Sequence, residues 1–303
     1  MTITDLLRTP RPRSVFALTH QAVIYGFLDG KRSGLERLES RSVAADCFQV
    51  GPVGLLQVKV ERLKATLESL KASLGEWPKK ASLVVPDAWL RTVLLELEAL
   101  PRRREEAEEV IRWRLKKLLP CRPEEVRLDY VPSMTNSRVL VAFGLDKPLS
   151  LLEEAFASMG CHLGSLEPVS VAVAAVLPSN SRPLLLLSIF DAAMAVVVVA
   201  AGQVQLTRLK LLPNGEARMH ALVLRELTRT VQLLGQYRLA EAGFSVVIGE
   251  CSEGLAQAVQ LWALEQRGVD VRRLGNPPGV PQGSVSPFLA WGLVAACQPG
   301  EGR

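Results

Sequence analysis

The sequence predicts an α/β protein of two lobes, the first of which carries an inserted α+β segment near residues 78–150. Two observations predict this class. Aliphatic runs of strand length are followed by helical patterns in both halves of the chain. The 303 residues are 48% hydrophobic and 22% charged, which is enough for full cores in one large or two ordinary domains. We therefore expect a flexible basic tail at 1–13, a first lobe at 14–177 that includes the insertion, and a second lobe at 178–303.

The first lobe is predicted to open with a hairpin and a helix. Apolar and polar residues alternate over 14–28 and indicate two strands that turn near 19–21. A third strand is expected within 35–50. Leucines and valines recur at helical spacing over 57–74, and Gly75 ends that helix. The glycine-containing segment between the second and third strands lacks the spacing of a phosphate-binding loop and predicts a polar turn.

The insertion is predicted to contain short strands and one long helix. A helix over 102–119 has glutamates in its first half and basic residues in its second, an order that complements the helix dipole. Trp113 lies well off the apolar face of this helix, so it either packs beneath a neighbouring element or anchors an interface. The residues predicted to share the apolar face are Ala107, Ile111, Leu115 and Leu118. The other elements expected from here to the end of the first lobe are strands at 81–85, 90–97, 126–131 and 138–144, and helices at 148–159 and 168–177.

The second lobe begins with the most apolar stretch of the chain, 184–201. It approaches the length of a membrane span, but Asp191 stands in its middle and both flanks have the length of a strand. We therefore predict two buried strands joined by a turn at 190–193. The remaining elements expected are strands at 204–211, 244–248 and 269–274, and helices at 216–240, 254–267 and 287–296.

Charge and reactive side chains exclude several functional classes. A net charge of +5 over the chain is a mild bias and not the footprint of a nucleic-acid-binding protein. The five cysteines are scattered without a CxxC pair, which fits a reducing compartment. None of the three histidines stands near a GxSxG serine or a plausible cysteine partner, so hydrolase chemistry is unsupported. The adjacent pair Cys161 and His162 has no second pair to complete a metal site, and we predict none.

A series of short motifs, in order along the chain, resembles PilM, the actin-like cytoplasmic family of type IV pilus assembly. In the first lobe the motifs are LVVPD at 83–87, LLELEALP at 94–101, EEVIRW at 108–113, LP at 119–120 and LDY at 128–130. In the second they are the helix at 225–237, VIGE at 247–250 and FLAWGLV at 288–294. Each motif is modest, and their order and spacing make the case.

The resemblance implies an actin-like (ribonuclease H-like) fold of two lobes with an inserted α+β subdomain. It also implies a cytoplasmic protein, peripheral to the inner membrane, that binds the cytoplasmic N-terminal segment of a PilN-like membrane protein. Pilus motor components would be further partners, no nucleic acid is expected, and membrane association would be indirect. A related cytoplasmic domain occurs in GspL of type II secretion. That protein continues into a transmembrane helix, whereas this chain shows none before Arg303, which favours the pilus alternative.

The chain departs from the family where actin-like proteins bind ATP. In the family, two hairpins with an acid and a glycine hold the phosphates and Mg²⁺, and a glycine pair lies near the adenosine. The corresponding positions here are Ala17 and Thr19 in the first hairpin, Ser188 and Phe190 in the second, and Gly249 followed by Glu250 at the glycine pair. We therefore expect no ATP or Mg²⁺ cofactor, no metal and no catalysis. The alternative is an actin-like ATPase in which Glu250 and Asp191 are the only obvious acids.

Partner binding needs no ATP chemistry, because an extended groove on the inserted subdomain suffices for a peptide. We expect that surface near Leu94, Leu97 and Trp113.

Overall fold

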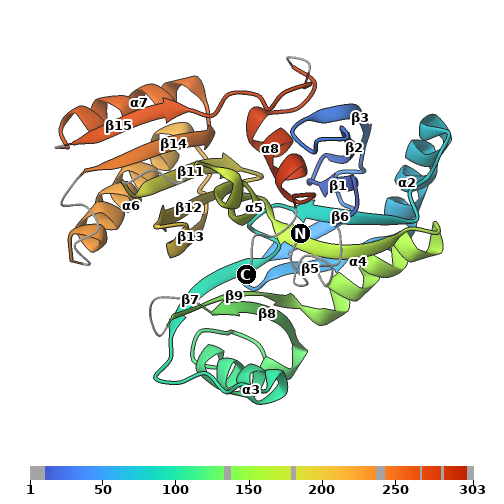
Figure 1. Ribbon diagram of the computed structural model, residues 1–303, viewed down its shortest axis with the longest axis horizontal. Coiled ribbons are helices and arrows are strands. Elements are labelled where there is room, and N and C mark those ends of the chain that lie inside the picture. Colours follow the sequence, from blue (N-terminus) through green and yellow to red (C-terminus); the bar gives the residue numbers. More distant parts are fainter. Residues whose placement is uncertain are drawn as a thin grey trace.

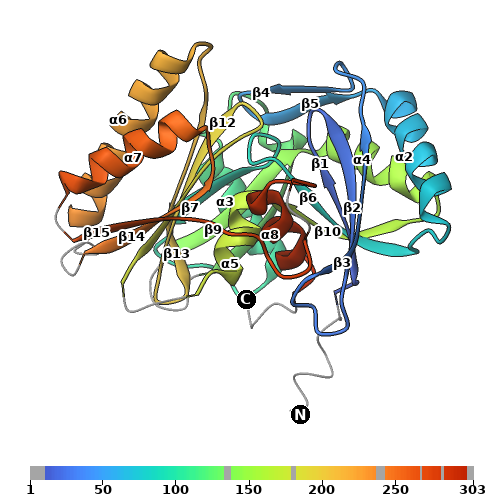
Figure 2. The ribbon, with the colours of Figure 1, turned by 90° about the horizontal axis from the view of Figure 1, so that it is seen from above.

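The computed structural model describes residues 11–132, 138–178, 182–236, 243–266, 268–280 and 283–298. Two five-stranded sheets form the two lobes, one on each side of the molecule in Figures 1 and 2. The first sheet contains β1 (Ser14–Leu18), β2 (Ala22–Leu28), β3 (Leu35–Ser42), β6 (Lys80–Val85) and β10 (His162–Pro168), in the order β10-β6-β1-β2-β3. The second contains β11 (Leu184–Phe190), β12 (Ala193–Ala200), β13 (Gln203–Leu211), β14 (Phe244–Glu250) and β15 (Val269–Arg273), in the order β13-β12-β11-β14-β15.

The two sheets repeat one construction. In each, three consecutive antiparallel strands are followed by a helix, a parallel strand, a second helix and a second parallel strand. The helices that follow this pattern are α2 (Val60–Leu74) and α4 (Asp146–Ser158) in the first lobe, and α6 (Glu216–Gln236) and α7 (Glu253–Leu264) in the second. The central strands β1 and β11 are buried on both faces, which explains their continuous apolar runs. The two-lobed α/β fold is thus confirmed.

Most predicted elements of the first lobe are present, with three differences. The segment 35–50 forms two strands, because β3 ends at Ser42 and a separate strand, β4 (Phe48–Gly51), pairs with β5 (Gly54–Val58). The predicted helix therefore starts at Val60 and not at 57, although its leucines are buried as expected. The strand β10 was not predicted. It is an edge strand whose side chains are mostly half-buried or exposed, so its apolar alternation is weak.

The polar turn between β2 and β3 is confirmed. The Asp29 carboxylate accepts hydrogen bonds from the backbone N–H (2.8 Å) and the hydroxyl (3.0 Å) of Ser33. Residues 1–10 of the predicted tail lie outside the described residues, while Arg11 and Arg13 are hydrogen-bonded to the rest of the protein. Arg11 donates to the carbonyl of Ala296 (3.1 Å), and Arg13 donates to that of Leu28 (2.9 Å).

The insertion between β6 and α4 forms a three-stranded antiparallel sheet covered by one helix, and Figure 1 shows it below the two lobes. Its elements are β7 (Arg91–Glu96), α3 (Arg104–Leu115), η1 (Pro123–Glu125), β8 (Val126–Pro132) and β9 (Arg138–Leu145), with strand order β7-β9-β8. Ala107, Ile111 and Leu115 are buried as predicted, but Leu118 is 59% exposed because α3 ends at Leu115. Trp113 is 60% exposed, on the solvent side of α3.

The apolar stretch 184–201 is the hairpin of β11 and β12, as predicted, with Leu184 opposite Val199 and Phe190 opposite Ala193. Among the described residues, no helix is both long enough and apolar enough to cross a membrane. The helix predicted over 216–240 is described to Gln236, and the last four of its predicted residues lie outside the described part.

Two short helices, α5 (Val169–Val176) and α8 (Pro287–Ala295), pack together between the lobes (Figure 2). One continuous core joins both sheets through them, since Val15 and Val84 of the first sheet and Leu186 and Val247 of the second belong to the same buried cluster. Gly292 allows this approach, because a Cβ there would lie 2.7 Å from Cγ2 of Val169. The lobes are therefore held by buried side chains as well as by the chain connection.

Candidate functional site

The turn between β1 and β2 uses its own backbone donors. The N–H groups of Gln21 and Ala22 donate to the Thr19 hydroxyl oxygen at 3.1 and 2.9 Å, and the N–H of Thr19 donates to the Ala22 carbonyl at 2.9 Å. The N–H of His20 donates to the carboxylate of Asp191 at 3.3 Å. A phosphate would need such N–H groups as donors. All four are already paired within the chain, and the neighbouring Ala17 is fully buried and apolar.

The turn between β11 and β12 faces the first turn and is tied to it. Asp191 and Ala192 both have positive φ, 52° and 62°, as in the two-residue hairpin turns that fit strand twist. This conformation brings the Asp191 carboxylate to Nδ1 of His20, at 2.5 Å. The His20 ring in turn meets Trp89 edge-to-face, with centroids 5.6 Å apart. We call the pair His20 and Asp191 the hairpin latch, since it joins the two turns that would flank a phosphate group.

A phenylalanine from α8 fills the space between the ends of the strands in the second lobe. Phe288 is fully buried and its ring lies 5.7 Å from that of Phe190. A Cβ on Gly249 would lie 2.6 Å from Cδ2 of Phe288, so this contact requires a glycine there. The next residue, Glu250, accepts a hydrogen bond from the Ser286 hydroxyl at the start of α8, and burial raises the pKa of its carboxyl.

A buried polar chain connects the second hairpin to the first lobe. The hydroxyl of Ser188 lies 2.9 Å from that of Ser170, which donates to the Asp87 carboxylate at 2.8 Å. The backbone N–H of Ser170, in the first turn of α5, also donates to Asp87 at 3.2 Å. Burial raises the pKa of Asp87 to about 6 despite these bonds. Asp87 was not predicted as a site residue, although an acid two residues after the strand at 81–85 was a usable signal.

These groups hydrogen-bond to one another across the two hairpins. Each polar group of the two hairpins named above has a partner in the chain. Within the described residues, no group of three or more His, Cys, Asp or Glu side chains is placed to hold a metal ion. The contacts between the hairpin groups fix the two hairpins against each other.

The three residues expected near a partner surface do not form one surface. Leu97 is 3% exposed and lies in the core beneath α3, so a partner cannot contact it. Leu94 is half-buried in β7, opposite Leu140 of β9. Trp113 is exposed on the opposite side of α3 from that core, because it lies away from the buried stripe formed by Ile111 and Leu115.

A groove that the sequence analysis missed runs beside β7, with a volume of about 190 Å³. Its wall combines the β4–β5 turn, β7, β9, the segment after α3 and one residue of β13 in the second lobe. The lining residues are Pro52, Val53, Arg91, Thr92, Val93, Leu118, Leu119, Pro120, Phe143 and Leu209. Arg91 is the only charged residue among them. Its Nη1 is buried without a hydrogen-bond partner, and burial lowers the pKa of its guanidinium. A buried cationic donor without a partner costs free energy, and an acceptor from another molecule that binds there would recover it.

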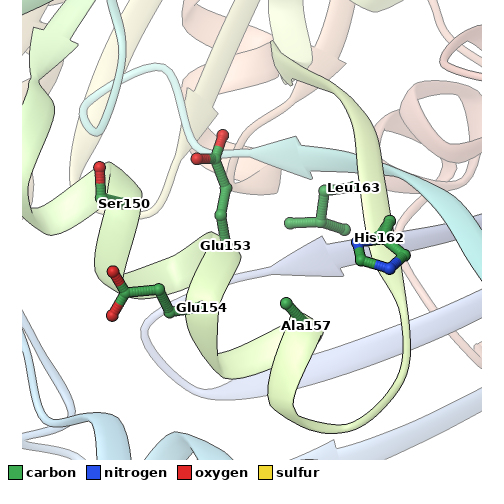
Figure 3. Close-up of a pocket in the computed structure, with 6 residues that line it drawn as sticks. All are labelled: Ser150, Glu153, Glu154, Ala157, His162 and Leu163. Atoms are coloured by element: carbon green, nitrogen blue, oxygen red, sulfur yellow. The ribbon is translucent and has the colours of Figure 1, made fainter.

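A larger, open hollow of about 420 Å³ lies between α4 and the start of β10 (Figure 3). Figure 3 shows the carboxylates of Glu153 and Glu154 pointing in different directions, with His162 across the hollow. Arg127 already binds Glu153 and the Ser150 hydroxyl, each at 2.7 Å. These side chains do not converge on a common point, and we assign no site there.

Two sheets of one topology, joined by paired helices and with their hairpin turns facing each other, define a protein of the actin-like class. Comparison with solved structures confirms this fold. The structure of a PilM-PilN type IV pilus biogenesis complex is similar over 95% of this chain and 98% of that chain, with a TM-score of 0.72 and 17% identity. A protein of unknown function with an actin-like ATPase fold from Bacteroides thetaiotaomicron covers 90% of this chain and 94% of its own, with a TM-score of 0.55 and 12% identity.

A weaker likeness, from which we do not argue, is to the cytoplasmic domain of EpsL, an inner membrane component of the type II secretion system of Vibrio cholerae. It covers 84% of this chain and 95% of that chain, with a TM-score of 0.48 and 10% identity. No protein-family model and no curated protein matches the sequence.

Proposed function

We propose that this protein is a non-catalytic actin-like adaptor of the type IV pilus assembly platform at the cytoplasmic face of the inner membrane. In this role it binds the cytoplasmic N-terminal segment of a PilN-like membrane protein, with pilus motor components as further partners. The observation that carries the proposal is the groove beside β7, whose apolar wall contains an arginine with its Nη1 buried and without a hydrogen-bond partner. An extended peptide supplies apolar side chains for such a wall and a carbonyl or carboxylate for Arg91.

The proposal that the protein lacks ATPase activity rests on the two hairpins. The hairpin latch and the Thr19 hydroxyl use the donors that a phosphate would need, and Phe288 occupies the space beside Gly249. A nucleotide would have to break the latch and displace buried aromatic rings. The similarity to a PilM-PilN complex supports the choice of partner.

The first experiment measures binding of a synthetic peptide with the cytoplasmic N-terminal sequence of the PilN-like protein from the same organism. Arg91→Met keeps the aliphatic stem of the side chain and removes its charged donors. We expect it to weaken peptide binding by about tenfold or more, since a charge-assisted hydrogen bond is lost. The same variant should melt at an equal or higher temperature, because a buried donor without a partner is removed from the free protein.

Arg218→Gln is the matched control and should bind like the wild type, since Arg218 is exposed on α6 and pairs with no carboxylate in the described part of the structure. Unchanged binding by Arg91→Met would show that the groove is not the peptide site. No binding of the peptide to the wild type would remove the proposed partner.

The second experiment is a thermal melt with and without saturating Mg-ATP. A ligand of the native state at about 100 times its dissociation constant adds roughly 2.7 kcal/mol, which shifts the midpoint by several degrees. We expect no shift. A clear Mg²⁺-dependent rise would favour the alternative, an actin-like ATPase with an unusual site.

A further inference from the structure

The end of α3 and the turn after it carry an exposed patch that shares only Leu118 with the groove beside β7. We call it the α3 patch, and it consists of Trp113, Arg114, Lys116, Lys117, Leu118 and Arg122. Trp113 and Leu118 are 60% and 59% exposed, which is unusual for apolar side chains of this size. In Figure 1, α3 lies at the outer end of the insertion, away from both large sheets, so the patch is accessible.

All four charged residues of the α3 patch are basic. Segregation of charge along α3 places its glutamates in the first half and leaves Arg114, Lys116 and Lys117 together at the end. In the part of the chain that the structure describes, none of these three, nor Arg122, has a carboxylate within ion-pair distance. Between residues 112 and 125 there are five basic side chains against two acidic ones, Glu124 and Glu125, which lie in η1. The patch therefore remains cationic after these neighbours are counted.

The apolar and cationic groups of the patch are intimately mixed. The guanidinium of Arg114 lies 5.2 Å and the ammonium of Lys117 lies 5.9 Å from the centre of the Trp113 ring. An indole ring flanked by long cationic side chains, with an exposed leucine one turn further on, fits the interface of an anionic lipid bilayer. Tryptophan prefers the headgroup level, and lysine and arginine reach the phosphates while their stems cover apolar surface. A nucleic acid or a polyglutamate chain would use the charges but would leave Leu118 without an apolar contact.

We propose that the α3 patch binds the surface of anionic phospholipid membranes directly. This differs from the expectation that membrane association is only indirect. It does not depend on the proposed partner, because vesicles contain no protein. The patch adjoins the groove, since Leu118 belongs to both. Contact through α3 would therefore orient the groove towards the bilayer from which a membrane protein's cytoplasmic segment emerges.

The test is co-sedimentation of the full chain with vesicles of phosphatidylcholine alone and of phosphatidylcholine mixed with phosphatidylglycerol. We expect binding to the mixed vesicles only, and weaker binding as salt is raised. Loss of one cation near such a surface costs about fivefold in affinity, so Arg114→Gln with Lys117→Gln should weaken binding about 25-fold. Trp113→Ala should also weaken vesicle binding, and this loss should not change with salt concentration because the lost contact is apolar.

The matched controls remove the same amount of charge, or a similar apolar side chain, from parts of the surface outside the α3 patch. Lys31→Gln with Arg218→Gln removes two exposed cations, and Leu264→Ala truncates a leucine that is 83% exposed on α7. Both should bind vesicles like the wild type. The proposal is overturned if the wild type does not bind the mixed vesicles, if it binds neutral vesicles equally well, or if the control pair loses as much binding as the α3 variants. Equal binding of soluble polyglutamate or DNA, unaffected by Trp113→Ala, would show a site for acidic polymers and also overturn it.

Discussion

At the scale of single residues, Asp87 makes stability depend on pH. Burial raises its pKa to about 6 from 3.8, so between those values the folded protein holds a proton that the unfolded chain releases. The free energy of unfolding therefore falls as pH rises from about 4 to about 7, by up to about 3 kcal/mol from this group. Asp87→Asn keeps an acceptor for Ser170 and should abolish this contribution.

The measurement is urea denaturation of both proteins from pH 4 to pH 7. The stability of Asp87→Asn relative to the wild type should increase across that range and then level off. Asp270→Asn, on the exposed edge strand β15, is the control for removal of a carboxylate. A constant difference between Asp87→Asn and the wild type would contradict the role given to Asp87.

Gly249 is a second residue whose role can be separated from nucleotide binding. If its glycine is required by the ring of Phe288, then Gly249→Ala should lower stability by about 1–3 kcal/mol through overpacking. Phe288→Leu removes the clashing ring edge at its own cost. In a double-mutant cycle, the stability lost by the double variant should therefore be about 1 kcal/mol smaller than the sum of the two single losses. Strictly additive effects would indicate that the glycine serves something other than this packing.

At the scale of elements, the β11–β12 turn contains two non-glycine residues, Asp191 and Ala192, in the strained backbone conformation of positive φ. Ala192 is exposed and has φ of 62°, a conformation that costs an L-residue roughly 1–2 kcal/mol. Ala192→Gly should therefore raise the free energy of unfolding by about 1 kcal/mol. Ala200→Gly, at the end of β12 and without positive φ, should lower it by about 0.5–1 kcal/mol. Chemical denaturation of both variants checks the opposite signs, and a loss of stability in both would contradict the turn geometry.

The elements also show what local patterns can and cannot predict. The α2 helix and the β11–β12 hairpin were predictable, because burial on one helix face or on both strand faces gives a clear apolar period. The edge strand β10 was missed, since its side chains are only partly buried. The substitutions at Thr19 and Phe190 were visible in the sequence. Their partners were not, because His20 and Asp191 lie 171 positions apart and Phe288 reaches Gly249 from the last helix.

At the scale of the whole molecule, one buried cluster joins the two lobes, each lobe also has a cluster of its own, and the insertion has a separate one. Leu186 belongs to the cluster that joins both sheets through α5 and α8, whereas Ile111 belongs to a separate cluster formed by α3, β7, β8 and β9. Cooperative units of unfolding follow such contiguous cores. The lobes should therefore open together, at the free energy of global unfolding, and the insertion should open alone at a lower free energy.

Native-state hydrogen exchange at increasing denaturant tests this division. Ile111→Ala and Leu186→Ala both truncate fully buried side chains and should each cost about 2–5 kcal/mol where they act. Ile111→Ala should reduce protection in β7, β8 and β9 alone and leave the hairpin latch closed. Leu186→Ala should reduce protection in β1 and β11 together, because Leu186 lies in the buried cluster that the two sheets share. If Leu186→Ala destabilised only the second sheet, the lobes would be independent domains, and the latch between their hairpins would then be the contact that holds them in register.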